Sequence, residues 1–194
     1  MRKLLIPAFV LAASAAFAQA PAHEDGPGPN MVIEVAAADG TPKGTITLDL
    51  LADKAPNHVA RLVELAKAGA YDGVVFHRVI DGFMAQTGDV EFGRGEVTPR
   101  SGTGGSELPD LPAEFSDIPF ERGVVGMARS QDPDSANSQF FITFEPAPFL
   151  DGEYTVVGEV TEGMEVVDAI RRGEGPNGAV TGEADRMESV TVTE

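Results

Sequence analysis

Short segments in which apolar and polar residues alternate recur from about residue 31 onward, and they predict a protein built mainly of β-strands. In residues 45–50, for example, Ile46, Leu48 and Leu50 share one face of the predicted strand while polar residues occupy the other. Comparable segments cover residues 31–37, 75–80, 84–87, 124–128, 140–143, 155–160 and 189–193.

The apolar period changes to that of a helix in residues 56–69. There Val59, Leu62, Val63 and Ala66 fall on one helical face, and Pro56 suits the first helical position. A second, shorter helix is predicted near residues 164–171. Many short strands combined with two helices predict a closed antiparallel β-barrel capped by the helices.

A long segment without periodicity, residues 90–120, separates the predicted strands. A loop of this length in a compact domain is usually functional or flexible, and its role stays open at this point. Its glycine-rich part, residues 102–106, lacks the Gly-Lys-Ser/Thr ending of a phosphate-binding loop and is predicted to be a turn. The length of 194 residues, with 22 glycines and 14 prolines, fits one β-rich domain with many turns.

The first residues have the pattern of an export signal. Arg2 and Lys3 precede the apolar residues 4–13, and small residues follow. Cleavage is predicted after Ala18, with Ala20 as the alternative site and an uncleaved anchor as the alternative interpretation. The predicted organisation is therefore a signal peptide (1–18), a flexible polar leader (19–30) and one domain (31–194). Such a protein is expected in a bacterial periplasm, with full secretion as the alternative.

Composition excludes several classes of function. A formal net charge of −17 predicts no binding to nucleic acid or anionic lipid, and the absence of cysteine excludes disulfides, thiolate metal sites and cysteine nucleophiles. The histidines, His23, His58 and His77, have no metal-ligand spacing. We expect His58 to face solvent and His77 to be structural. No metal or cofactor is predicted.

Residues 76–89, with the sequence FHRVIDGFMAQTGD, combine a cation, an apolar surface and an amide within a short stretch. On a strand, Arg78 would share a face with Phe76 and Ile80, which suggests a guanidinium held at the edge of an apolar patch. The alternative is a structural arginine in a salt bridge.

Three further motifs follow in order: GMAR at 126–129, SQFFIT at 138–143 and FLDG at 149–152. With these four motifs the chain resembles the cyclophilin family over about residues 31–194. The resemblance implies an eight-stranded antiparallel β-barrel capped by two α-helices, with a substrate groove on its outer surface. It also implies peptidyl-prolyl cis/trans isomerase activity.

The resemblance assigns each motif residue a role in this sequence. Arg78 takes the catalytic position, and the amides of Gln86 and Gln139 belong to the groove. The remaining substrate-binding residues are the pocket-lining Phe83, Met84, Phe141 and Leu150, the backbone-contacting Ala128 and Arg129, and the rim residues Phe149 and Tyr154.

Isomerisation suits a chain without a nucleophile constellation, because the X–Pro bond is rotated and no bond is broken. The expected partners are proline-containing segments of exported proteins that are still folding, bound by a monomer. The alternative is a cyclophilin-fold chaperone that binds such segments with little turnover. A hydrolase has no sequence support.

Three positions depart from residues common in the family. Phe149 stands where many members have Trp, which predicts weakened cyclosporin binding. Tyr154 replaces a common His at the groove edge. Arg129 replaces a common Asn, and a cation there is expected to favour acidic residues in the substrate.

Overall fold

The computed structural model describes residues 26–193. The predicted signal peptide and most of the predicted leader lie outside these residues. The described end of the leader is attached to the domain, because the Gly26 N–H donates to Asp49 Oδ2 at 2.9 Å and the Leu50 N–H donates to the Pro29 carbonyl at 3.1 Å. The first strand begins at Asn30, close to the predicted domain start at residue 31.

Within the described residues, one antiparallel sheet of nine strands has the order β3-β9-β1-β2-β8-β6-β7-β5-β4. The strands are β1 (Asn30–Ala36), β2 (Pro42–Leu50), β3 (Val74–Val75), β4 (Arg78–Ile80), β5 (Met84–Thr87), β6 (Val124–Met127), β7 (Phe140–Thr143), β8 (Val156–Glu162) and β9 (Arg186–Thr193). The helices are α1 (Pro56–Lys67) and α2 (Met164–Asp168), with 3-10 turns η1 (Pro148–Leu150) and η2 (Pro176–Gly178).

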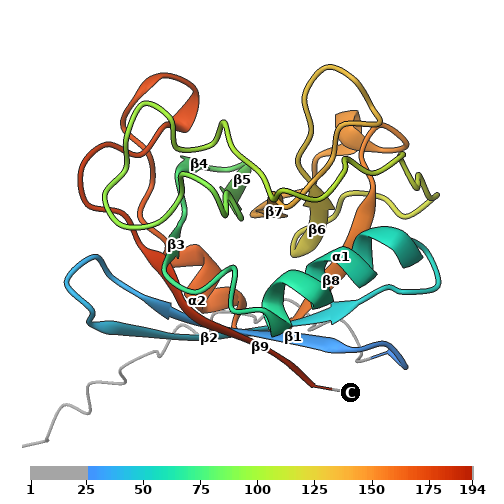
Figure 1. Ribbon diagram of the computed structural model, residues 1–194, viewed down its shortest axis with the longest axis horizontal. Helices are drawn as coiled ribbons and strands as arrows, with labels where there is room; N and C mark the ends of the chain where they lie inside the picture. The colour runs from blue at the N-terminus through green and yellow to red at the C-terminus, as the bar shows by residue number, and fades with distance from the viewer. Residues whose placement is uncertain (1–25, 194) are drawn as a thin grey trace, which may run out of the picture.

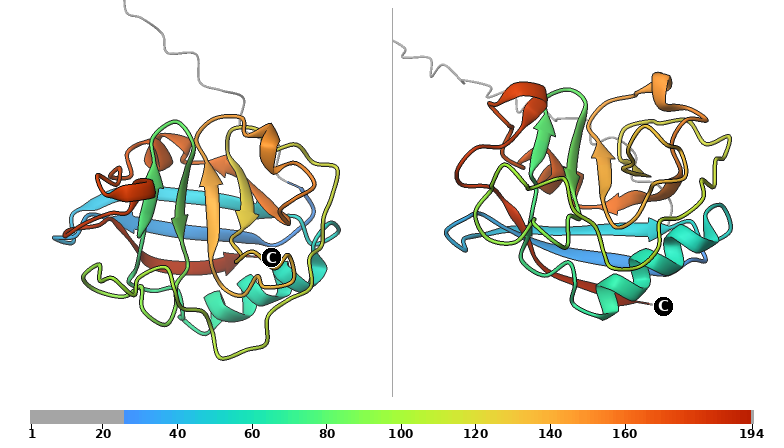
Figure 2. Two further views of the ribbon diagram at one scale, coloured as in Figure 1. Left: turned by 90° about the horizontal axis from the view of Figure 1, so that it is seen from above. Right: turned by 45° about the horizontal axis from the view of Figure 1, so that its top comes forward.

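The sheet curls until its two edge strands are joined by the chain itself. β3 pairs with β9 and β4 pairs with β5, yet only Phe76 and His77 separate β3 from β4. The views in Figure 1 and Figure 2 show the layer of β4, β5, β6 and β7 crossing steeply over the layer of β1, β2 and β9. The predicted barrel-like fold with two helices is thus confirmed. The sheet has nine strands among the described residues, where eight were expected. The difference arises because the single strand predicted at 75–80 forms two strands, β3 and β4, one at each edge of the sheet.

The apolar core fills the space between these layers. The predicted apolar face of β2, formed by Ile46, Leu48 and Leu50, is fully buried. Helix α1 covers one side with Val59 and Leu62, and it contacts β9. Neither helix among residues 26–193 is long and apolar enough to cross a membrane.

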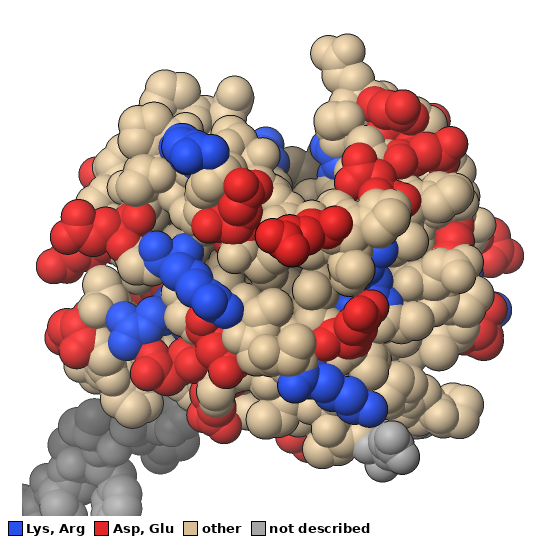
Figure 3. Space-filling view, in the orientation of Figure 1, with Lys and Arg blue, Asp and Glu red and all other residues tan. Residues whose placement is uncertain are grey.

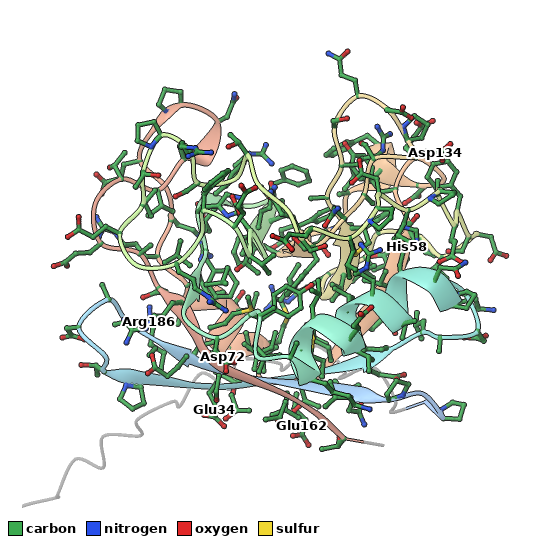
Figure 4. The ribbon with its side chains drawn as sticks, in the orientation of Figure 1. Glu34, His58, Asp72, Asp134, Glu162 and Arg186 are labelled. Carbon is green, nitrogen blue, oxygen red and sulfur yellow. The ribbon has the colours of Figure 1, made fainter. Side chains whose placement is uncertain are left out.

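His58 on α1 is buried, which corrects the expectation that it faces solvent (Figure 4). Its Nδ1 lies 2.7 Å from Glu114 Oε2, and the same carboxylate accepts the N–H groups of Asn57 and His58. The N-cap residue Ala55 has no side chain that caps the helix. Glu114, from the long loop, therefore satisfies the free N–H groups of the first turn of α1.

The long loop is also anchored near its beginning. The carboxylate of Asp89, fully buried, accepts the N–H groups of Phe92, Gly102 and Gly104. Farther along, Asn137 accepts the N–H of Ser106 through Oδ1 at 2.7 Å. These polar contacts hold residues 90–114 against the barrel without regular secondary structure, so the loop is organised by side-chain anchors.

Candidate active site

A groove with a volume of about 660 Å³ opens on the layer that contains β4, β5, β6 and β7. The structure brings to it every predicted site residue except Gln139, together with Glu153, which the sequence did not single out. Its lining consists of Arg78, Phe83, Met84, Gln86, Ala128, Arg129, Phe141, Phe149, Leu150, Glu153 and Tyr154.

The floor of the groove is apolar and firmly packed. Met84, Phe141 and Leu150 are 2%, 5% and 6% exposed and belong to a small apolar cluster beside the main core. Phe141 stacks on Phe120 with ring centroids 5.7 Å apart. A Cβ on Gly126 would lie 2.6 Å from the Phe141 ring, so only glycine at this position of GMAR leaves room for that ring. The floor can receive a compact apolar ring.

Aromatic side chains form the walls above this floor. Phe83 and Phe149 lie with ring centroids 5.3 Å apart, and Tyr154 meets Phe141 edge-on at 5.7 Å. The side chains of η1 diverge: Leu150 points into the floor, whereas Phe149 is 68% exposed at the rim. Phe149 is therefore the wall residue that a ligand extending beyond the floor would cover.

Arg78 lies at the polar edge of the groove, directly opposite Gln86 in the β4–β5 pairing. Its Nε donates to the Asn177 carbonyl and its Nη1 donates to Gln86 Oε1, each at 3.0 Å. Nη1 also lies 3.9 Å from Met84 Sδ. All of these partners are neutral, and Nη2 has no hydrogen bond to residues 26–193. Burial lowers the pKa of Arg78 from its ordinary value, but a guanidinium stays charged at neutral pH.

The amide of Gln86 is itself held in place. Gln86 Nε2 donates to Gln139 Oε1 at 2.9 Å, and Gln139 Nε2 donates to the carbonyls of Gly102 and Gly104 at 3.1 and 2.8 Å. Gln139 lines a neighbouring polar groove of about 520 Å³ instead of the first groove. It therefore reaches the first groove through Gln86 and connects the long loop to Arg78.

The guanidinium of Arg129 is directed at carbonyls of its own loop and of the segment that contains Glu153. Its guanidinium donates to the carbonyls of Glu153 and Ser130 and lies over the Tyr154 ring at 4.5 Å. Its side chain is 14% exposed, whereas that of Glu153 is 68% exposed. The preference of Arg129 for acidic substrate residues stays a prediction; the more exposed charge at this rim is the Glu153 carboxylate. The Ala128 N–H is also engaged, since it donates to the Gln139 carbonyl at 2.9 Å.

Sequence reasoning missed two contributions to the site. Glu153 lies between Leu150 and Tyr154 in the chain, so its neighbours were the signal that could have identified it. The carbonyl of Asn177 comes from a turn 99 residues from Arg78 and belongs to none of the motifs. Among residues 26–193, no group of three or more His, Asp or Glu side chains gathers as metal ligands.

Comparisons with known proteins agree on one family. The profile of the family described as "Cyclophilin type peptidyl-prolyl cis-trans isomerase/CLD" matches residues 32–192. A protein named "Probable peptidyl-prolyl cis-trans isomerase" from Brucella suis biovar 1 is 62% identical over 141 residues, 71% of this chain and 72% of that protein. A peptidyl-prolyl cis-trans isomerase of Synechococcus elongatus is 41% identical over 136 residues, 69% of this chain and 87% of that protein.

The crystal structure of cyclophilin AquaCyp293 from Hirschia baltica is similar to this fold, with a TM-score of 0.68 and 26% sequence identity. The similarity covers 86% of this chain and 74% of that one. The chain belongs to the cyclophilin family. Its enzymatic activity is accordingly that of a peptidyl-prolyl cis-trans isomerase.

His77, next to Arg78 in the chain, lies beneath the glycine-rich turn of the long loop. A Cβ on Gly102 would lie 2.7 Å from the His77 ring. The ring is 5% exposed, and neither of its nitrogens has a hydrogen-bond partner among the described residues. Burial lowers the pKa of His77 to about 4, against a smaller opposing attraction from Asp89.

Acidification is therefore expected to destabilise the fold through His77. The unfolded chain has the ordinary histidine pKa of 6.5 and the folded chain a pKa of about 4, so between these values the unfolded chain binds the proton first. The free energy of unfolding then falls by about 2 to 3 kcal/mol from this group as the pH drops. His77→Gln, which does not titrate, should remove that part of the decline in urea unfolding measured at neutral pH and near pH 4. Parallel pH profiles of the two proteins would contradict the assignment.

Proposed function

We propose that this isomerase uses Arg78 as its catalytic group and assists the folding of exported proteins by rotating their X–Pro bonds. The observation that carries the proposal is the position of the Arg78 guanidinium, fixed by neutral partners at the edge of a firmly packed apolar pocket. A pocket of this kind takes a pyrrolidine ring, and a free N–H beside it can reach the ring nitrogen.

The apolar floor supplies binding. A proline ring placed on Met84, Phe141 and Leu150 would leave water, and its rigid shape matches a pocket whose side chains are already held by packing. The ring then stays fixed while the residue before it turns. Binding alone lowers no barrier, because both planar isomers and the twisted state bury the same ring.

The charge on Arg78 supplies catalysis. Peptide resonance gives a rotation barrier of about 18–20 kcal/mol, and twisting the bond returns a lone pair to the prolyl nitrogen. A donor aimed at this nitrogen stabilises the twisted state more than either planar state. Arg78 Nη2 has no protein partner in the described structure and is available for that bond, while Nε and Nη1 hold the group in place. The relay from Gln139 through Gln86 keeps this geometry preorganised.

Replacing Arg78 by Ala is expected to lower kcat/KM about 100-fold or more, the usual loss when one transition-state donor is removed. Exchange between the cis and trans forms of a short Ala-Pro peptide, followed by NMR, measures this effect. Arg94→Ala is the control, because Arg94 also donates to carbonyls, those of Gly69 and Ala70, but lies outside the groove. Equal acceleration by wild type and Arg78→Ala would disprove the role of Arg78. No acceleration by wild type would instead favour the binding-module alternative.

The proposed location of the isomerase is the periplasm, which the charged and apolar pattern of residues 1–18 supports. There the isomerase would act as a monomer, and its substrates would be proline-containing segments of newly exported chains. Full secretion is the alternative location. The acidic surface, with red carboxylates spread over the face in Figure 3, favours solubility in either place.

Expression in a bacterium from the full gene is expected to yield a periplasmic protein that begins at Gln19. Cell fractionation and N-terminal sequencing of the purified protein measure both properties. A start at Pro21 would move the cleavage site to Ala20 without changing the compartment. A membrane-bound protein that retains Met1 would establish the uncleaved anchor and contradict the proposal.

Cyclosporin is proposed to bind this isomerase weakly, because the exposed rim position holds Phe149 instead of Trp. Phe149→Trp should therefore lower the inhibition constant of cyclosporin about tenfold, while kcat/KM for the Ala-Pro peptide stays within about twofold of wild type, since the pocket floor is untouched. Inhibition assays on both proteins test this. An unchanged inhibition constant would show that the rim residue does not determine sensitivity.

A further inference from the structure

We propose that the turn η2, at residues 176–178, is a positioning element for Arg78, with the Asn177 carbonyl fixing the guanidinium through Nε. The inference rests on the proposed catalytic role of Arg78. It assigns a catalytic contribution to a backbone atom far from the four sequence motifs. Four observations support it: the conformation of Asn177, the docking of the turn on β4, the geometry of the guanidinium and the exposure of the Asn177 side chain.

Asn177 has an unusual backbone conformation. With φ 55° and ψ 28° it is left-handed, and it is the only residue other than glycine with positive φ among residues 26–193. This region is unfavourable for L-residues, and asparagine tolerates it better than most. Residues held in such conformations cluster at functional sites. Here the conformation places the Asn177 carbonyl 3.0 Å from Arg78 Nε.

The turn is docked on the strand that carries Arg78. A Cβ on Gly178 would lie 2.4 Å from Ile80 Cγ1 and 2.9 Å from the Val79 carbonyl oxygen, so the backbone of the turn packs directly on β4. Ala179 forms a bridge with Arg78. The Val180 N–H donates to the His77 carbonyl, and the Gly173 N–H donates to the Val79 carbonyl, each at 2.9 Å. These contacts fix the position of the turn against β4 on both sides of Arg78.

Two hydrogen bonds determine the plane of the guanidinium. The Asn177 carbonyl accepts from Nε, and Gln86 Oε1 accepts from Nη1, each at 3.0 Å. Because the guanidinium is rigid and planar, fixing these two donors also fixes the direction of Nη2. With the Gln86 bond alone, the group would retain freedom to swing about its own side chain. The turn thus supplies the second constraint on the direction of Nη2.

The exposed side chain of Asn177 allows a clean test, because it can be changed without disturbing the core. Asn177→Val introduces a β-branched residue that disfavours the left-handed conformation, whereas the matched Asn177→Gly accepts it freely. Displacing the carbonyl by about 1 Å would cost on the order of 10- to 100-fold in rate. We expect Asn177→Val to lower kcat at least tenfold with KM nearly unchanged, and Asn177→Gly to stay within about threefold of wild type.

The resonance of the Arg78 Nε–H in a ¹⁵N NMR spectrum reports the contact directly. It should shift and exchange faster with water in Asn177→Val and keep its position in Asn177→Gly. An unshifted resonance and wild-type kcat in Asn177→Val would overturn the proposal. If Arg78→Ala retains full activity, the proposed catalytic role itself fails, which is a separate outcome. A purely structural turn would change the melting temperature of Asn177→Val without changing kcat.

A second pair of variants covers the case in which Asn177→Val fails to fold. Gly178→Ala adds a Cβ that collides with Val79 and Ile80 at φ 73°, whereas Gly182→Ala adds one at φ 71° with nothing within 4 Å. Both substitutions place an alanine at a similar positive φ, so their backbone strain is similar. Only Gly178→Ala is expected to displace the turn from β4. Gly178→Ala should lower kcat at least tenfold and Gly182→Ala should leave it near wild type. In an Arg78→Lys background, which lacks the planar fork, Gly178→Ala should cause no further loss; an additive loss would overturn the proposal.

Discussion

The closure of the sheet between β3 and β4 is the constraint on which the rest of the site depends. Phe76 and His77 carry the chain from one sheet edge to the other, so β3 is tied to β9 while β4 is tied to β5. This leaves Arg78 at the first position of the closing strand, opposite Gln86 and beside the turn that contains Asn177. A register slip of one residue would turn Arg78 toward the core and Val79 toward the groove. The short connection that joins the two sheet edges therefore also places the side chain proposed as catalytic.

The neutral surroundings of Arg78 are notable in a protein of net charge −17. A carboxylate at hydrogen-bond distance would pair with the guanidinium and weaken its field in the groove. The hydrogen-bond and sulfur partners of Arg78 are instead a carbonyl, an amide and a thioether. Arg129 is the contrasting case, because its guanidinium is bonded to the carbonyls of Ser130 and Glu153 and lies over the Tyr154 ring. The two cations of the groove thus differ: the hydrogen bonds of Arg78 leave its Nη2 without a partner among the described residues, whereas Arg129 holds the wall of the groove.

The sequence pattern predicted most of the strands and both helices, and what it missed depends on contacts between residues far apart in the chain. Alternation along β2 and the helical period of α1 depend on neighbours in sequence, so the strands and the barrel were accessible, whereas the groove lining was accessible only through the family resemblance of the four motifs. Burial of His58 depends on Glu114, which lies 56 residues away in a loop without periodicity. The contact of the Asn177 carbonyl with Arg78 depends on a left-handed backbone conformation that the sequence pattern does not predict. Gln139 was assigned to the groove by its motif, but its reach through Gln86 appears only once the side chains are placed.

The separation between the pocket floor and its rim explains how a family site can change without losing its reaction. Met84, Phe141 and Leu150 are buried in one apolar cluster with Phe120, so a change in any one of them would disturb the packing of the cluster. Phe149 has one ring neighbour and is mostly exposed, so it can change at little cost to the fold. In the proposed binding mode a proline ring needs only the floor, whereas a large ligand must also cover the rim. On that proposal, substitutions at the rim would alter inhibitor and substrate preference, while the packed floor and the fixed guanidinium would preserve isomerisation.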